Sequence, residues 1–257
     1  IDGHGTHCAG TVFGQDVDGV RIGVARDARA LVAKVIDDDG GGGSDSIVEA
    51  LLWAADEKAD VISMSLGIDF PGFVAELQAA GIRSEAATSI GLEAYVATLE
   101  IYQKLIEFLL AVGHDHGPLI VAAAGNGSDH QADPPLELSV EPPAAADSVL
   151  SVGAVGRDND GFSLARFSNI NPDLVGPGVD IVSAELRGGL AALSGTSMAT
   201  PHVAGVAALW SQKLGRPGEP PSLAQVRASV TAQTTLDGLG QHARRADVGS
   251  GLIRSPV

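Results

Sequence analysis

Short apolar runs recur along the chain and alternate with segments that have helical spacing. We expect strands at five of these runs, residues 30–36, 60–66, 119–124, 149–155 and 179–184. Helices are predicted over residues 44–58, 197–214 and 222–232. Strands that are apolar at successive positions are buried on both faces. The pattern therefore indicates an α/β fold, a three-layer α/β/α arrangement with a mostly parallel sheet.

One long segment interrupts this alternation. Residues 70–117 separate two predicted strands and are too many for a single crossover helix. Apolar residues recur there every three or four positions, at Leu92, Tyr95, Val96, Leu99, Tyr102, Ile106 and Leu109. This spacing predicts a long amphipathic helix. We expect it to pack on the flank of its own domain, and the alternative is a helix that binds a partner and makes the chain an interaction protein.

The composition indicates a folded protein with an acidic surface. The 257 residues include 16 Lys and Arg against 32 Asp and Glu, a formal net charge of −16, and 45% are hydrophobic. Such a surface repels phosphate groups, which argues against nucleic acid as a partner. No apolar run approaches the roughly 18 residues of a membrane span. The single cysteine, Cys8, allows no internal disulfide.

Two histidines near the start of the sequence are the first candidates for chemistry. His4 and His7 stand in the string H-G-T-H-C-A-G-T. Histidines at this spacing could ligate a metal, but zinc proteases of the H-E-x-x-H type use a glutamate as base, and none is present here. Taken alone, the string is as well explained by a helix start with packed histidines.

A serine near the C-terminus has the surroundings of a nucleophile. Ser197 lies in G-T-S-M-A-T-P-H-V-A-G, residues 195–205, and Pro201 is expected in the first turn of a helix that begins near Ser197. The free N–H groups at a helix start stabilise a developing oxyanion. A lone serine in this position usually only caps its helix. The string is not G-x-S-x-G, so the α/β-hydrolase arrangement does not apply.

Two predicted strand ends carry further candidates. Asn126 follows the apolar run A-A-A-G, at the carboxyl edge of the sheet where α/β proteins bind ligands. Asn126 alone would be a turn residue, but beside a nucleophilic serine its amide could donate to an oxyanion. Ser65, Leu66 and Gly67 end another strand, whose exposed backbone could pair with an extended peptide.

These strings, in this order, resemble those of the subtilisin-like serine proteases, the subtilases. His7 followed by Cys8, together with the string at 195–205, is most similar to the proteinase K branch. The resemblance covers nearly the whole chain apart from residues 70–117. It implies a single subtilase catalytic domain over residues 1–257, with a helical insertion at about 70–117.

The resemblance also implies the roles of individual residues. The expected reaction is the hydrolysis of peptide bonds in a polypeptide through an acyl-enzyme. Ser197 would be the nucleophile, His4 the general base and Asn126 the oxyanion donor, while Cys8 would be an inert thiol. The residues implied to line the substrate cleft are Ser65, Leu66, Gly67, Gly40, Gly41, Gly42 and Gly125.

The sequence departs from the family at the third catalytic residue. In subtilases an aspartate in a D-[ST]-G string, on a central strand, precedes the histidine, yet only three residues precede His4. We therefore expect an N-terminally truncated domain, with the aspartate supplied by an N-terminal segment or a second chain. The alternative is a catalytically impaired pseudoprotease or a peptide-binding module.

Three further expectations come from the resemblance and the charge. No cofactor is required, and Asp16 and Asp18 are weak candidates for structural calcium, although such a site needs about six to eight oxygens and an acidic surface turn is the alternative. Gly127 adds no charge beside Asn126, which favours an apolar residue at P1, the substrate position whose carbonyl is attacked. The acidic surface favours a secreted, extracellular protein.

Overall fold

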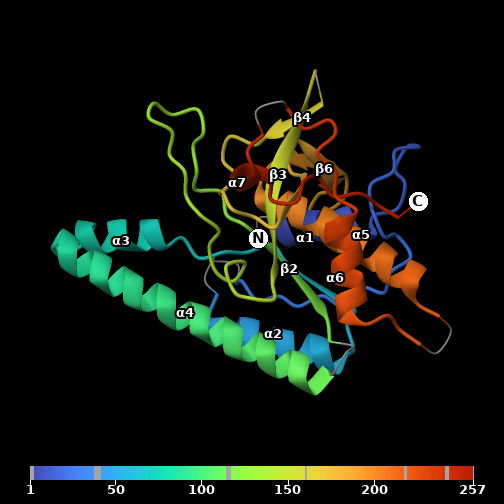
Figure 1. Cartoon of the computed structure of the whole chain (residues 1–257), viewed down its shortest axis with the longest axis horizontal. Coiled ribbons are helices and arrows are strands. Elements are labelled where there is room, and N and C mark those ends of the chain that lie inside the picture. The colour runs from blue at the N-terminus through green and yellow to red at the C-terminus, as the bar shows by residue number, and fades with distance from the viewer. Residues whose placement is uncertain are drawn as a thin grey trace.

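The structure, a computed structural model, describes residues 3–37, 42–113, 117–159, 161–216, 219–240 and 243–256. Its centre is a sheet in which β1 (Val61–Met64), β2 (Leu119–Ala123) and β3 (Leu150–Asp158) are parallel neighbours in that order. β5 (Leu174–Pro177) pairs with β3 in parallel, and β4 (Gly161–Leu164) pairs antiparallel with the end of β3. This mostly parallel sheet confirms the predicted α/β class (Figure 1).

Helices cover both faces of the sheet. α5 (Thr196–Leu214) and α6 (Leu223–Ala232) contribute to one hydrophobic core, and α2 (Ser44–Asp56) and α4 (Ser84–Gly113) to the other (Figure 1). The three layers confirm the predicted architecture. A short helix, α7 (Arg245–Val248), follows near the C-terminus.

Successive residues of β2 face opposite cores. Leu119 and Val121 belong to the core under α5, whereas Ile120 and Ala122 belong to the core under α4. Side chains alternate across a strand, so a strand between two helical layers must be apolar at every position. This explains why its apolar run predicted β2 correctly.

The first helix, α1 (His4–Phe13), packs against α5 and against a separate hairpin. The hairpin consists of β6 (Ile181–Ala184) and β7 (Leu190–Leu193), which pair antiparallel. The run at 179–184 was expected to join the parallel sheet. It does form a strand, but its only ladder within the described residues is with β7.

His7 connects α1 to both strands of this hairpin. Its ring is almost fully buried, and Nε2 donates to the carbonyls of Ile181 at 2.9 Å and Ala191 at 3.1 Å. Carbonyl oxygens only accept, so the proton must be on Nε2. The second histidine of the H-G-T-H string is therefore a packing residue, as one of its two interpretations expected.

The expected strand at residues 30–36 does not form. A strand is defined by hydrogen bonds to a neighbouring strand, and no ladder includes these residues in the described part of the chain. Val32 is 72% exposed, although its apolar sequence context predicts burial. Within the described residues, β1 also has a strand, β2, on one side only.

The insertion forms two helices where one was predicted. α3 (Phe70–Ala79) begins after Asp69, whose carboxylate accepts from the N–H of Gly72 at 2.8 Å. α3 lies along the first half of α4, and the two make an arm that projects from the body (Figure 1). The second half of α4 packs on the domain through Tyr102, Ile106 and Leu109, all buried, which confirms the expected packing on the domain's flank.

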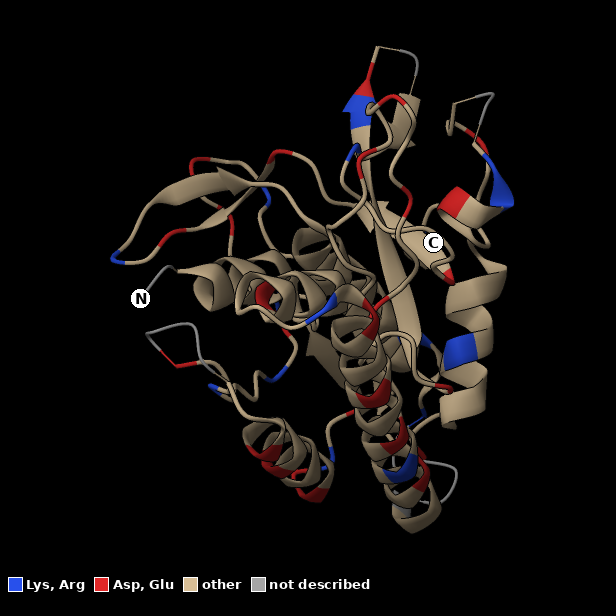
Figure 2. Ribbon diagram, turned by 90° about the vertical axis from the view of Figure 1, so that its left-hand side faces the viewer, with Lys and Arg blue, Asp and Glu red and all other residues tan. Residues whose placement is uncertain are grey.

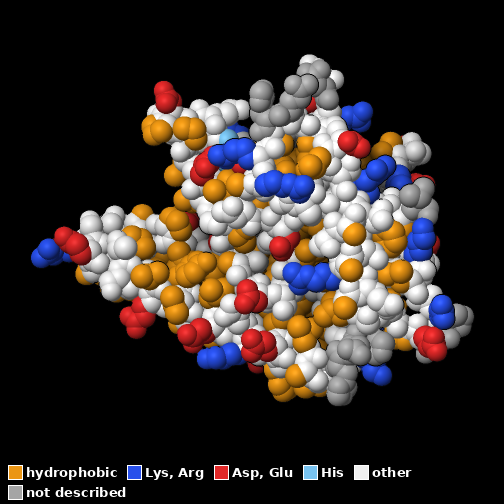
Figure 3. Space-filling view, viewed as in Figure 1, with side chains coloured by type: hydrophobic (Ala, Val, Ile, Leu, Met, Phe, Trp, Pro, Cys, Tyr) orange, Lys and Arg blue, Asp and Glu red, His pale blue; other side chains and the backbone are white. Residues whose placement is uncertain are grey.

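The projecting half of α4 keeps part of its apolar stripe exposed. Leu92 is 63% exposed and Val96 47%, so these two residues of the predicted stripe do not pack on the domain. Figure 3 shows hydrophobic side chains gathered along this arm. In Figure 2, Asp and Glu recur on the turns of α2 and α4. No helix in the described ranges is long and apolar enough to cross a membrane.

Candidate active site

Ser197 is the second residue of α5, and Pro201 lies four residues further inside the same helix. The proline was expected in the first turn; it lies one turn further along. Because proline has no N–H, the carbonyl of Ser197 loses its intrahelical donor. The hydroxyl of Ser65 donates to this carbonyl at 2.8 Å and the thiol of Cys8 at 3.4 Å. The start of α5 is thus joined to the end of β1 and to α1.

The contact at Cys8 also places His4. Residues four apart in a helix lie on the same face, one turn from each other. His4 is the first residue of α1, one turn before Cys8, so it lies on the face of α1 that contacts the start of α5. His4 and Ser197 are both half-buried. The structure therefore brings the two predicted residues to the starts of two packed helices.

The side chain of Asn126 is held by the residue before Ser197. Its Oδ1 accepts from the N–H of Thr196 at 2.8 Å and from the Thr196 hydroxyl at 3.0 Å. Two donors on one atom identify it as the oxygen, so the other end of the amide is Nδ2. Within the described residues Nδ2 makes no hydrogen bond, and Asn126 is exposed. A fixed N–H donor is therefore available beside Ser197.

The loop that carries Asn126 requires a glycine before it. Gly125 has φ +112°, a conformation that side chains disfavour, and its N–H donates to the Thr196 hydroxyl at 3.3 Å. A Cβ on Gly125 would also overlap the side chains of Asn169 and Glu141. A larger residue therefore cannot occupy position 125 without displacing these side chains, and the expected role of Gly125 in the substrate cleft stays a prediction.

Asn169 supports this loop and was not predicted. It is 1% exposed, and its Oδ1 accepts from the N–H groups of Gly127 at 3.1 Å and Ser128 at 3.0 Å. Its Nδ2 donates to the carbonyl of Ala124 at 3.2 Å. No sequence signal pointed to this role, because Asn169 lies 43 positions beyond Asn126 in an irregular loop.

The predicted cleft residues are described only in part. Ser65 contacts Ser197 as stated above, and the half-buried side chain of Leu66 packs against the core under α4. Gly67 is exposed at the same strand end, and Gly42 is exposed before α2. Gly40 and Gly41 lie outside the described residues, so the structure describes one wall of the predicted cleft.

Glu141 is the main residue at this site that the sequence did not reveal. Its carboxyl group lies against both Gly67 and Gly125, where a Cβ on either glycine would overlap it. Burial, and to a lesser degree the negative charge of Asp69, raise the pKa of Glu141 to about 7. Glu141 lies in the proline-rich stretch 133–143, which on sequence grounds is an irregular surface loop.

The donors near Asp16 and Asp18 do not fit a calcium site. Asp16 binds Arg26 at 2.7 Å, and Asp18 lies in a turn with φ +51°. Nowhere in the described ranges do three His, Cys, Asp or Glu side chains group so that they could hold a metal. Calcium needs about six to eight oxygens. The arrangement matches the acidic surface turn that was the alternative.

A mostly parallel sheet between helices, with a serine and a histidine at two packed helix starts, defines an α/β protein of subtilisin type. The chain belongs to the subtilase family: the family model described as "Subtilase family" matches residues 1–251. The "Intracellular serine protease" of Paenibacillus polymyxa is 38% identical over 211 residues, which are 82% of this chain and 54% of that protein. "Subtilisin BL" of Lederbergia lenta is 32% identical over 254 residues, 99% of this chain and 76% of that one.

Two solved structures have the same fold. The "Prenylagaramide maturation protease PagA" superimposes with a TM-score of 0.70 at 26% identity, covering 99% of this chain and 80% of that one. A serine-to-alanine mutant of the "protease domain of PatA" gives 0.64 at 29% identity, covering 98% and 77%. The chain spans about half the length of the first curated relatives that it matches, 54% in each case.

Proposed function

We propose that the protein to which this chain belongs is a serine endopeptidase, and that Ser197, His4 and Asn126 act in its reaction. The observation that carries this proposal is the position of Asn126, whose amide Thr196 fixes immediately beside Ser197. An N–H donor held in advance next to a nucleophile is what acyl transfer requires, because negative charge develops on the attacked carbonyl oxygen.

Each of these residues has its own role in the proposed reaction. The Ser197 hydroxyl attacks the peptide carbonyl, and His4 takes its proton as general base. The oxyanion receives hydrogen bonds from Asn126 Nδ2 and from the N–H of Ser197, one of the first-turn groups of α5 without an intrahelical partner. His4 gives the proton to the leaving amine, and water later releases the acyl group by the same path. No step of this reaction uses a cofactor.

The substrate is an extended polypeptide that lies along the strand end at Ser65, Leu66 and Gly67. Relatives named serine proteases support this substrate class. The predicted opposite wall at residues 40–42 stays part of the proposal. The net charge of −16 argues against nucleic acid as a partner. Export remains a prediction: two similar proteins are named intracellular, so their names lend it no support.

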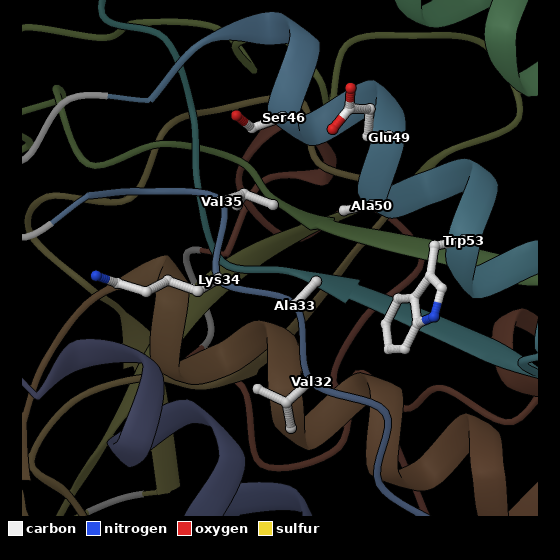
Figure 4. A pocket seen from close by; sticks show the side chains of 8 residues that line it. All are labelled: Val32, Ala33, Lys34, Val35, Ser46, Glu49, Ala50 and Trp53. Carbon is white, nitrogen blue, oxygen red and sulfur yellow. The ribbon is translucent and has the colours of Figure 1, made fainter.

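The catalytic aspartate would come from an N-terminal segment or a second chain, on a strand that pairs with β1. Two observations support this placement: within the described residues β1 has a strand neighbour on one side only, and no strand ladder there includes residues 31–35. A hollow of about 340 Å³ separates residues 32–35 from α2 (Figure 4). A strand beside β1 would complete the sheet and draw this segment into it.

A fluorophosphonate probe, which reacts with activated serines, tests the proposed function in the full-length protein. We expect labelling that Ser197→Ala abolishes and that the matched control Ser194→Ala, three residues away, leaves unchanged. In a subtilisin, loss of the catalytic aspartate alone lowers kcat about 3 × 10⁴-fold. Residues 1–257 by themselves should therefore hydrolyse peptides about 10⁴-fold more slowly than the full-length protein. Absence of labelling in the full-length protein would support the pseudoprotease or peptide-binding module instead.

A further inference from the structure

The carboxyl group of Glu141 lies between two strand ends of the site. Its neighbours there are Gly67, after β1, and Gly125, directly before Asn126. The backbone holds it in place: the N–H of Glu141 donates to the carbonyl of Ala124 at 3.1 Å, and the next carbonyl, Pro142, accepts from Ile68 at 3.1 Å. The loop of Glu141 is therefore hydrogen-bonded to the segments that follow both strands.

Within the described part of the chain, no cation balances this carboxylate. Glu141 forms no ion pair there and its side chain no hydrogen bond, and the charge that acts on it is that of Asp69, which is also negative. A partly buried carboxylate without a partner is costly. A partly buried carboxylate of this kind costs less free energy when a bound ligand brings a positive charge next to it.

A substrate side chain would approach the same place. The attacked carbonyl must lie between Ser197 and the amide of Asn126. The P1 side chain is attached to the atom next to this carbonyl, and Gly125 immediately precedes Asn126 in the chain. A Cβ on Gly67 or on Gly125 would overlap the carboxyl group of Glu141, so the two glycines let this carboxyl group lie between the strand ends, next to Asn126.

We propose that Glu141 is a specificity-determining residue that lies at the base of the P1 pocket and selects lysine or arginine. The inference rests on the proposed endopeptidase function. A basic side chain can extend between the two strand ends with its stem and bring its charged end to the carboxylate. A basic P1 residue replaces the apolar P1 residue that was expected from Gly127. Gly127 does not set the preference, because a Cβ there would face Leu138. The charge at the site comes instead from Glu141, 14 positions later.

Two peptide phosphonate probes with one sequence, carrying either lysine or leucine at P1, test this proposal in the full-length protein. The measurement is the rate of Ser197 labelling at pH 8. We expect the lysine probe to react about 10- to 100-fold faster than the leucine probe, the discrimination that a hydrogen-bonded charge provides. Glu141→Gln should abolish this ratio, and Glu141→Asp, which keeps the charge on a shorter stem, should retain part of it.

The matched control is Glu93→Gln, the same change at an exposed glutamate of α4, which should keep the full ratio. Equal rates for the two probes in the wild type, or a ratio that survives Glu141→Gln, would overturn the proposal while fluorophosphonate labelling still supports the endopeptidase. A full-length protein that no fluorophosphonate labels would overturn both.

Discussion

At Asn126 the two ends of one amide have different tasks. The oxygen end accepts two hydrogen bonds from Thr196, and the nitrogen end makes none within the described residues, so it can donate to a substrate. At Ser197 the same division occurs on the backbone: Pro201 removes the intrahelical donor, and the carbonyl binds Ser65 and Cys8. In both cases a group without reactivity positions one that is proposed to react. Precise placement of this kind contributes much of the rate in acyl transfer.

Glu141 leads to a prediction about stability and pH. Its pKa of about 7 in the folded protein exceeds the value of 4.5 expected for an exposed glutamate, so the folded state binds its proton more tightly than the unfolded state. The free energy of unfolding therefore falls as pH rises from about 4.5 to about 7. Glu141→Gln removes this loss, and after allowance for solvent screening it should raise stability by about 1–2 kcal/mol at pH 8.

Urea denaturation at pH 5 and at pH 8 measures this effect. The gain at pH 8 should largely vanish at pH 5, where Glu141 of the folded wild type is protonated. Glu93→Gln, at an exposed position, should change the free energy of unfolding by less than about 0.5 kcal/mol at either pH. A Glu141→Gln protein that is equally stable or less stable at pH 8 would contradict a raised pKa.

The site residues that the sequence predicted have their supporting context close by in the chain, whereas the residues that it did not predict are far from their partners in the chain. His4, Ser197 and Asn126 stand in strings that carry their own local context, a helix start or a strand end. Glu141 and Asn169 act through loops that only the fold brings to the site, 15 and 43 positions after Asn126. Neither lies in a periodic segment, so its neighbours could not be inferred from the sequence.

Elements were predictable where their environment is uniform along their length. β2 lies between two helical layers throughout, and its apolar run identified it. Residues 30–36 form a similar apolar run with one lysine, but a strand also needs a neighbour, and composition does not report one. The apolar stripe of α4 was read as one face, although only its second half reaches the domain, because the stripe does not show where the supporting surface ends.

Because only the second half of α4 packs on the domain, two similar substitutions in this helix should change the free energy of unfolding by very different amounts. Ile106 is 1% exposed in the core under α4, so Ile106→Ala should lower the free energy of unfolding by about 2–5 kcal/mol. Leu92 is exposed on the projecting half, and Leu92→Ala should change it by less than about 0.5 kcal/mol. Chemical denaturation measures both. A large loss at Leu92 would mean that another surface covers the arm in solution.

For the molecule as a whole, the open edge of β1 and the exposed segment 31–35 have one explanation. Parallel sheets in α/β proteins are covered on both faces and are stable as continuous sheets. Here the described sheet ends at β1, and no strand ladder among the described residues includes the apolar segment 31–35. A proposed strand from an N-terminal segment or a second chain would join the two and bring the aspartate toward His4.

Hydrogen exchange distinguishes a sheet with an added strand beside β1 from a sheet in which β1 is the edge strand. In the full-length protein, amides at residues 31–35 and at the free edge of β1 should exchange at least about 100-fold more slowly than in residues 1–257 alone, since pairing removes them from solvent. The amides of β2, paired on both sides in either case, serve as the internal control. If residues 31–35 exchange equally fast in both proteins, no strand is added there, and the aspartate must reach His4 by another route.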